Sequence, residues 1–339
     1  MDTAVKARID QVKADCLAGR RQDRQTIIDL LAICPGSEEY RYLCQAAREA
    51  AAVITGGEAY LWGAIGVDFA PCPMNCRFCS LGESWGIVRD EVSYSEDEII
   101  SQIRQYVNCG VRFIVLRTTE FYSVDTLCTF IRHIRGQVEG AYELVLNIGE
   151  FDIPTAQKIY DSGVSGIYHA LRLGEGRDTA FDPAERCNTL HSVHSSPLKL
   201  IHLIEPLGEE HTGEEIADVF LNSLDHGVSI SGAMARIPVQ GTPMGDMPQV
   251  SNERLAQVVA VTRLCGGKEV PDICVHPACQ EAVEAGANVV VVERGAVPRT
   301  GQISEDLWNG FDCAKAKALL ESAGYTVVQK RDDDRSLSS

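Results

Sequence analysis

The chain has 339 residues, of which 45% are hydrophobic and 23% charged, and 48 acidic residues outnumber 31 basic ones to give a formal net charge of −17. This is the composition of a globular protein and excludes collagen-like, coiled-coil and fully disordered chains. The charge disfavours nucleic acid and anionic lipid as partners. Because no segment reaches the roughly 18 apolar residues of a membrane helix and residues 1–15 lack the apolar run of a secretory signal, we expect a cytoplasmic protein without membrane or nucleic-acid partners.

The first 58 residues predict helices and no strands. Apolar residues recur at helical spacing over residues 4–18, 23–32 and 37–53, and the pair Gly56-Gly57 closes the segment. We interpret residues 1–58 as a helical extension that precedes the main domain.

From residue 59 onward, short β-branched runs alternate with amphipathic stretches. The predicted strands cover residues 60–69, 112–117, 143–148, 166–171, 198–204, 228–237, 269–275 and 288–292. The predicted helices cover residues 96–109, 124–135, 154–162, 183–193, 213–226, 252–264, 278–285 and 313–323, and the pair Ser95 and Glu98 predicts a capping box for the first of them.

Eight alternating units favour an α/β fold, a complete (β/α)8 TIM-type barrel over residues 59–325. An open doubly wound sheet is the weaker alternative, because no G-x-G-x-x-G follows the first strand. In a barrel of this kind the chemistry belongs to the loops after the strands. Residues 326–339 end in a charged, apolar-poor stretch and predict a disordered tail.

Three cysteines stand directly after the first predicted strand, as Cys72-x3-Cys76-x2-Cys79. Three thiolates in one short, turn-rich loop favour a soft metal centre. A four-iron cluster with only three protein ligands keeps one iron open for a substrate or cofactor. The alternatives are a zinc loop, which wants a fourth Cys or His that is not near in sequence, and three incidental thiols.

This motif, with Phe78 before the last cysteine and its place after the first strand, resembles the radical S-adenosylmethionine superfamily. The helical N-terminus and the eight units are similar, over about residues 20–325, to the branch of biotin synthase, methylornithine synthase and the [FeFe]-hydrogenase maturase. The resemblance implies a [4Fe–4S] cluster on Cys72, Cys76 and Cys79, with S-adenosylmethionine on the open iron. An electron from a donor such as flavodoxin or ferredoxin would then release a 5′-deoxyadenosyl radical, which takes hydrogen from a small substrate.

The resemblance also implies where S-adenosylmethionine is held. The Thr118-Thr119-Glu120 turn after the second strand stands where relatives contact the amino group, although its glycines are missing. Glu150 is a candidate for the ribose hydroxyls, and backbone contacts to the adenosine are expected after the sixth strand. Taken alone, Glu120 also reads as a polar loop acid and Glu150 as a helix-start acid. The remaining expected cofactor contacts are Phe78, Glu175, Arg186, Ile237 and Pro238.

Several cationic side chains follow other strands, and a guanidinium suits an anionic group. They are candidates for contacting the substrate, and the alternative for each is a structural ion pair or solvent exposure. They are Arg172, His202, Arg236, His276, Arg294 and Arg299.

The leading hypothesis is therefore a radical enzyme of cofactor biosynthesis or metallocofactor maturation. One alternative is sulfur insertion, which needs a second iron–sulfur cluster as its sulfur source. We expect no such cluster from Cys274, His276, Cys279 and Cys313, because Pro277 opens a helix between the candidates. A non-catalytic iron–sulfur scaffold or electron carrier, and a zinc-dependent barrel hydrolase, are alternatives from other classes.

Overall fold

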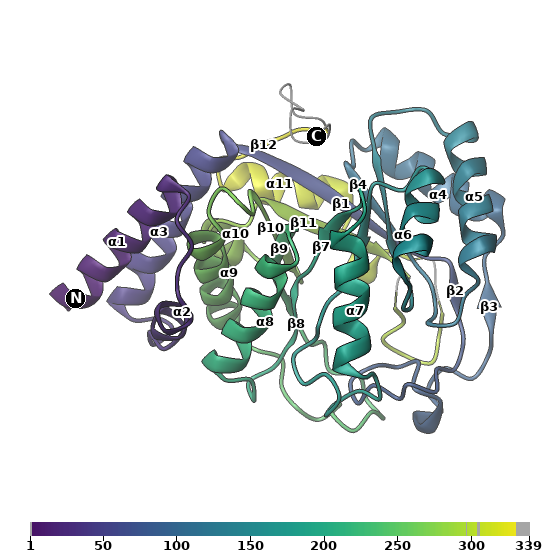
Figure 1. Ribbon diagram of the computed structural model, residues 1–339, viewed down its shortest axis with the longest axis horizontal. Helices are drawn as coiled ribbons and strands as arrows, with labels where there is room; N and C mark the ends of the chain where they lie inside the picture. The colour runs from purple at the N-terminus through teal and green to yellow at the C-terminus, as the bar shows by residue number, and fades with distance from the viewer. Residues whose placement is uncertain (1, 296, 304–305, 330–339) are drawn as a thin grey trace.

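Eight parallel strands close into a barrel at the centre of the molecule (Figure 1). The computed structural model describes residues 2–295, 297–303 and 306–329. Hydrogen bonds join the strands in the order β1, β4, β5, β6, β7, β9, β10 and β11, and β11 pairs with β1 to complete the circle. This confirms the predicted (β/α)8 barrel. The strands are β1 (Glu58–Gly66), β4 (Phe113–Arg117), β5 (Glu143–Asn147), β6 (Gly166–Tyr168), β7 (Lys199–Ile201), β9 (Val228–Ala235), β10 (Asp272–His276) and β11 (Val289–Arg294).

Helices follow the barrel strands and cover the outside of the barrel (Figure 1). They lie within a few residues of the predicted ranges, and the capping box of Ser95 and Glu98 is present at the start of α4. The helices are α4 (Glu96–Asn108), α5 (Val124–Gln137), α6 (Ile153–Asp161), α7 (Pro183–His194), α8 (Gly213–Asp225), α9 (Asn252–Gly266), α10 (Gln280–Glu284) and α11 (Cys313–Ser322), with 3-10 turns η1 (Glu83–Trp85) and η2 (Trp308–Gly310). Among the described residues, no helix is long and apolar enough to cross a membrane.

Two predicted strands are interrupted. The first ends at Gly66, and the next residues form β2 (Asp68–Phe69), which pairs antiparallel with β3 (Val92–Ser93) outside the barrel. The fifth breaks after Ile201 and resumes as β8 (Ile204–Leu207), because its register against β9 shifts there. Both interruptions lie at the C-terminal ends of strands, where the chain leaves the barrel.

The C-terminal boundary expected at residue 325 is too early. Residues 326 and 327 form β12 (Thr326–Val327), which pairs with the start of β1 and so gains backbone hydrogen bonds that a disordered tail lacks. The rest of the predicted tail, residues 330–339, lies outside the described residues.

The N-terminal helices α1 (Thr3–Ala18), α2 (Arg24–Leu31) and α3 (Glu38–Thr55) lie against α8 and α9 at one side of the barrel (Figure 1). Their apolar side chains belong to the same continuous core as those of the barrel helices. Within α9, residues 255–266 are all buried because the extension covers the face that barrel helices usually expose. The division at residues 58 and 59 stays a proposal about chain organisation, since the two parts share one core.

Strand alternation decides which side chains fill the barrel. Phe113 and Val115 of β4 belong to a separate apolar cluster in the barrel interior, whereas Ile114 and Leu116 belong to the core beneath the helices. By the same two-residue period Arg117 faces inward at the end of β4. Its counterparts on β5, β10 and β11 are Asn147, His276 and Glu293. The inner apolar core is thus capped by a polar layer at the C-terminal ends of the strands, where barrel enzymes place their sites.

Candidate active site

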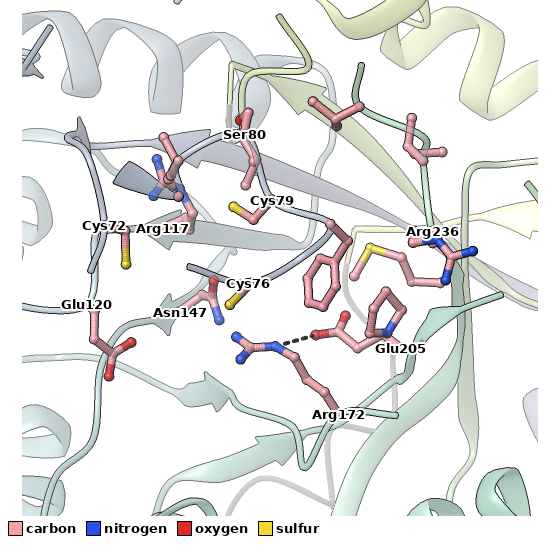
Figure 2. Close-up of a pocket in the computed structure, with 18 of the residues that line it drawn as sticks. Cys72, Cys76, Cys79, Ser80, Arg117, Glu120, Asn147, Arg172, Glu205 and Arg236 are labelled. Carbon is pink, nitrogen blue, oxygen red and sulfur yellow. Dashed lines mark ion pairs between the residues drawn. The ribbon is translucent and has the colours of Figure 1, made fainter. Parts of the chain in front are cut away.

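The three motif cysteines line a cavity of about 240 Å³ at the C-terminal end of the barrel (Figure 2). Their loop is held by backbone hydrogen bonds, of which Cys72 N to Leu81 O measures 2.6 Å. Asn75 adopts a left-handed conformation at φ 44°, which Asn tolerates better than most residues. Its amide binds both Pro73 O and Ser84 N, at 2.9 and 2.8 Å. The loop is therefore shaped by its own contacts.

The donor set fits a cluster better than a single ion. Cys72, Cys76 and Cys79 are free thiols that face one cavity. Among the described residues, no three His, Cys, Asp or Glu side chains are arranged to hold one metal ion. The thiolates of a cluster each bind a different iron, so three thiols around one cavity suit a cluster as its ligands. Burial raises the pKa of Cys72, and it raises that of Cys76 to about 12, so a metal must displace thiol protons to bind.

A carboxyl group and a guanidinium face the cysteine loop from the barrel. Glu120 lines the cavity after β4, and burial raises its pKa. Arg172 lines it after β6, with Nη1 3.6 Å from Glu175 Oε1 and Nε 3.9 Å from Glu205 Oε1 (Figure 2). Burial opposes the charge of Arg172, but Glu175, the Cys76 thiol and Glu205 outweigh it and raise its pKa. Arg172 Nη1 is buried without a hydrogen-bond partner among the described residues, so it keeps a donor for a ligand.

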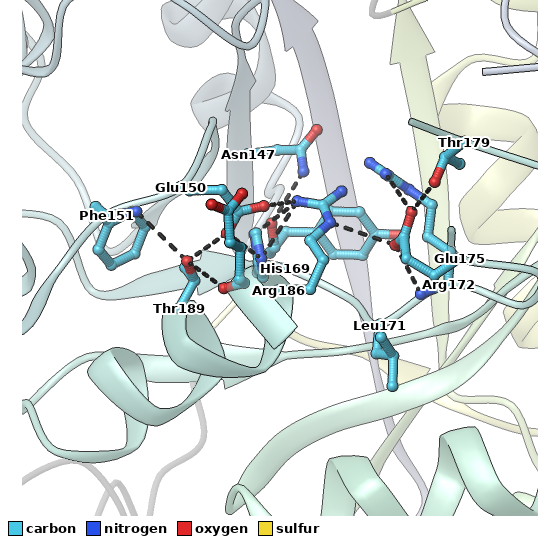
Figure 3. Close-up of polar contacts among 12 residues, drawn as sticks. Asn147, Glu150, Phe151, His169, Leu171, Arg172, Glu175, Thr179, Arg186 and Thr189 are labelled. Carbon is cyan, nitrogen blue, oxygen red and sulfur yellow. Dashed lines mark hydrogen bonds and ion pairs between the residues drawn. The ribbon is translucent and has the colours of Figure 1, made fainter. Parts of the chain in front are cut away.

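Behind this face, Arg186 joins two carboxylates (Figure 3). Its Nη1 donates to Glu150 Oε1 at 2.8 Å and its Nε to Glu175 Oε2 at 3.3 Å. Glu150 also lies 3.2 Å from His169 Nε2 and accepts a hydrogen bond from Thr189. Burial works against the charge of Glu150, but His169, Arg186 and Thr189 outweigh it and lower its pKa to about 2. Burial and Arg186 lower the pKa of His169 to about 4, so this histidine is neutral at neutral pH.

Comparisons with known proteins find relatives in sequence and in fold. No family model matches the chain. Biotin synthase 2 of Corynebacterium diphtheriae is 24% identical over 351 residues, covering 96% of this chain and 98% of the relative. A biotin synthase of Acaryochloris marina is 24% identical over 288 residues, covering 78% and 80%.

Two solved structures share the fold. The [FeFe]-hydrogenase maturase HydG from Carboxydothermus hydrogenoformans superposes with a TM-score of 0.78 at 16% identity, covering 98% of this chain and 82% of the maturase. Methylornithine synthase gives 0.77 at 16% identity, covering 95% and 98%. In sequence and fold the chain resembles the biotin synthase branch of the radical S-adenosylmethionine superfamily.

The sequence-predicted site residues fall into two groups. One group lines the cavity with the cysteines and consists of Phe78, Thr118, Thr119, Glu120, Arg172, Arg236, Ile237 and Arg299. The other group lies outside the described cavity lining and consists of Glu150, Glu175, Arg186, His202, Pro238, His276 and Arg294. Within the second group, three residues form a chain of ion pairs behind the cavity wall (Figure 3). Glu175 pairs with Arg172 of the wall, Arg186 pairs with Glu175, and Glu150 pairs with Arg186.

Several candidate substrate residues already have partners in the protein. Arg236 forms a two-pronged ion pair with Glu210. His276 Nε2 lies 3.3 Å from Glu293 Oε2, and Arg299 Nη2 lies 3.4 Å from the same oxygen. His202 is fully buried, and its Nε2 accepts a hydrogen bond from the backbone of Leu171 at 3.1 Å. Their contacts to a substrate stay a prediction.

The cysteines considered for a second cluster do not meet. Cys274 faces the barrel interior, whereas Cys279 packs against the outer core. Cys313 begins α11, also on the outer side. The expected absence of a second cluster stays a prediction, but these placements give the described residues no shared site for one.

Sequence reasoning missed part of the cavity wall. Arg117, Asn147 and Tyr168 stand at the ends of β4, β5 and β6, whereas Met234 lies near the end of β9 and Glu205 lies in β8. For Arg117, Asn147 and Glu205 the signal was available in principle, because each lies two residues beyond an inward apolar residue, as Arg117 does beyond Val115. Polar residues that continue a strand's inward face are candidates for the site even when no motif marks them.

Proposed function

We propose that this radical enzyme holds a [4Fe–4S] cluster on Cys72, Cys76 and Cys79 and binds S-adenosylmethionine in the adjoining cavity, where it acts on a small substrate. When bound, the two groups supply reductive cleavage of the carbon–sulfur bond and hydrogen abstraction. The observation that carries the proposal is that the three motif thiols, the carboxyl group of Glu120 and the guanidinium of Arg172 line the same cavity.

Glu120 and Arg172 suit the two charged groups of the methionine moiety. Glu120 accepts from the ammonium group, and that cation favours the charged carboxylate against the burial that raises its pKa. Arg172 donates to the carboxylate through Nη1, which has no hydrogen bond of its own. We assign Arg172 this role in place of Arg186, because Arg186 is engaged by Glu150 and Glu175 and lies outside the described lining.

The turn that carries Glu120 is held from two sides. Thr119 donates its backbone N–H and its hydroxyl to the carboxylate of Asp68, with 2.7 Å between Thr119 N and Asp68 Oδ1. Thr118 N donates to the carbonyl of Asn147 at 3.0 Å. The two threonines thus fix the turn, and Glu120 is the residue left to face the ligand.

The adenosine has an apolar wall available on the other side of the cavity. Met234, Ile237 and Val239 line it from β9 and the segment that follows. Such side chains suit a purine ring, and backbone groups at Ile237 and Pro238 remain the expected hydrogen-bond partners. Glu150 then holds Arg186 in place behind the cavity wall. Its contact to the ribose stays a prediction.

Among the possible reactions, we favour cofactor biosynthesis or metallocofactor maturation over sulfur insertion. The described residues place Cys274 inside the barrel and Cys279 outside it, so no sulfur-donating cluster is supported there. A non-catalytic carrier is disfavoured because an electron carrier needs neither Glu120 nor Arg172 in a cavity. The electron donor we propose is a flavodoxin or ferredoxin.

The test is anaerobic reconstitution with iron and sulfide, followed by dithionite and S-adenosylmethionine. Wild-type protein should release 5′-deoxyadenosine and methionine. Glu120→Gln and Arg172→Gln should keep their iron and lose most of this cleavage, whereas Arg132→Gln, at an exposed position on α5, should behave as wild type. Iron-loaded wild-type protein that leaves S-adenosylmethionine intact would refute the proposed function.

A further inference from the structure

One cation of the cavity forms no ion pair with any residue that the structure describes. Arg117 ends β4, is 7% exposed and lines the cavity. Its Nη2 donates to the backbone carbonyl of Asp68 at 2.6 Å, and its guanidinium stacks 4.7 Å from the Phe69 ring centroid. Its Nε is buried without a hydrogen-bond partner, and no carboxylate of the described residues forms an ion pair with it.

The buried charge of Arg117 is not fully balanced by the acidic side chains that the structure describes. Moving a charge out of water costs several kcal/mol unless an opposite charge compensates. Burial lowers the pKa of Arg117, and its acidic neighbours do not offset the effect. The first of these, Asp68, gives both carboxylate oxygens to Thr119. Arg172 is the contrast, because its acidic neighbours more than compensate for its burial.

Arg117 lies beside the cysteine loop, so a negative group bound to that loop would balance its charge. The Phe69 ring on which Arg117 stacks packs in one small apolar cluster with Cys72 and Cys79. Arg117 and Arg172 line the same cavity as the three motif thiols. Figure 2 shows the two guanidinium groups on opposite sides of the cysteine sulfurs.

We propose that Arg117 is a counter-charge of the iron–sulfur cluster and raises the reduction potential of the cluster. The proposal rests on the proposed function, because it needs a cluster on these cysteines. A fixed positive charge favours the state that carries one more electron, and charge and hydrogen bonding near the sulfurs are known to set cluster potentials. The electron comes from the external one-electron donor, and no proton transfer is required of Arg117, which is a positioning residue in this scheme.

The experiment is a redox titration of the reconstituted cluster, followed by electron paramagnetic resonance, without S-adenosylmethionine or substrate. Arg117→Gln should keep the iron content of wild type and show a more negative midpoint potential. Arg117→Lys, which restores the charge, should recover part of the shift. Arg132→Gln removes the same charge from an exposed position on α5 and should leave the potential unchanged.

An unchanged potential in Arg117→Gln would overturn the proposal. If Arg117→Gln fails to load iron, Arg117→Met provides a second neutral side chain. Loading by the lysine variant, with failure of both neutral ones, supports a charge requirement, and failure of all three variants overturns it. Failure of the proposed function is separate, because the wild-type protein itself would then take up no cluster on Cys72, Cys76 and Cys79.

Discussion

Arg186 Nη1 lies 2.8 Å from Glu150 Oε1, and the same guanidinium donates through Nε to Glu175 (Figure 3). Arg186 is 2% exposed and packs 4.2 Å from the ring centroid of Phe181, which lines the cavity. The ion pair of Arg186 with Glu175 therefore connects α7 to the cavity wall, since Glu175 also pairs with Arg172. A change at Arg186 should be felt at the ligand without direct contact.

Replacing Arg186 by Met should destabilise the protein and weaken S-adenosylmethionine binding together. The buried carboxylate of Glu175 and the partly buried one of Glu150 lose their cation, which costs up to about 3–5 kcal/mol by analogy with broken buried ion pairs. Arg172 loses the fixed position of Glu175, so calorimetry on iron-loaded protein should show an affinity roughly ten- to hundred-fold lower. Arg186→Lys should be intermediate, because it keeps the charge without the fork. Weaker binding with an unchanged melting temperature would place Arg186 at the ligand instead.

Iron binding should depend on the motif cysteines and on no other thiol. Replacing Cys72, Cys76 and Cys79 by Ala should abolish the brown iron–sulfur absorbance, while circular dichroism shows that the barrel stays folded. Cys274→Ala and Cys279→Ala are the matched controls and should each keep about four irons per chain. If wild type holds six to eight irons and these controls lose some of them, a second cluster exists and sulfur insertion becomes the leading chemistry.

Gly149 should be required for placing Glu120. A Cβ at this position would lie 2.2 Å from the backbone carbonyl oxygen of Glu120 and 3.0 Å from its Oε1. Backbone cannot yield as a flexible side chain does, so Gly149→Ala should displace the Thr118–Thr119–Glu120 turn. We expect normal iron content and at least ten-fold weaker S-adenosylmethionine binding. Gly136→Ala, with no atom near its added Cβ, is the control and should bind as wild type.

Stability should fall in acid through Glu150. Its folded-state pKa is about 2, compared with an ordinary value of 4.5. Because the folded state resists protonation, this contribution is fully present above about pH 4.5 and is lost as the pH falls toward 2. It amounts to on the order of 3 kcal/mol. His169 acts in the same direction at higher pH, since its folded pKa is lowered to about 4.

Urea unfolding of wild type and Glu150→Gln between pH 6 and pH 3 measures this effect. The variant should lose less stability over this range than wild type. Glu284→Gln, which changes an exposed carboxylate on α10, should reproduce the wild-type slope. Parallel curves for wild type and Glu150→Gln would show that Glu150 is not the group responsible.

The sequence by itself determined the barrel, the helical extension and the place of the cysteine loop. Those features depend on local patterns: strands and helices alternate with their own periods, and Cys72, Cys76 and Cys79 lie within one loop. The predicted helix boundaries lie close to the observed ones for the same reason, because caps such as Ser95 with Glu98 act within one turn.

Only the tertiary structure decided which charges meet. Arg186 and Arg172 lie on the same stretch of chain as Glu175, yet one is bound behind the wall and the other faces the cavity. Arg117 carries no motif at all, and its lack of a counter-charge emerges only when the barrel closes around it. The physical reason is that ion pairing and burial depend on contacts between strands that lie tens of residues apart in the sequence. A pattern read along the chain does not show which of those residues meet.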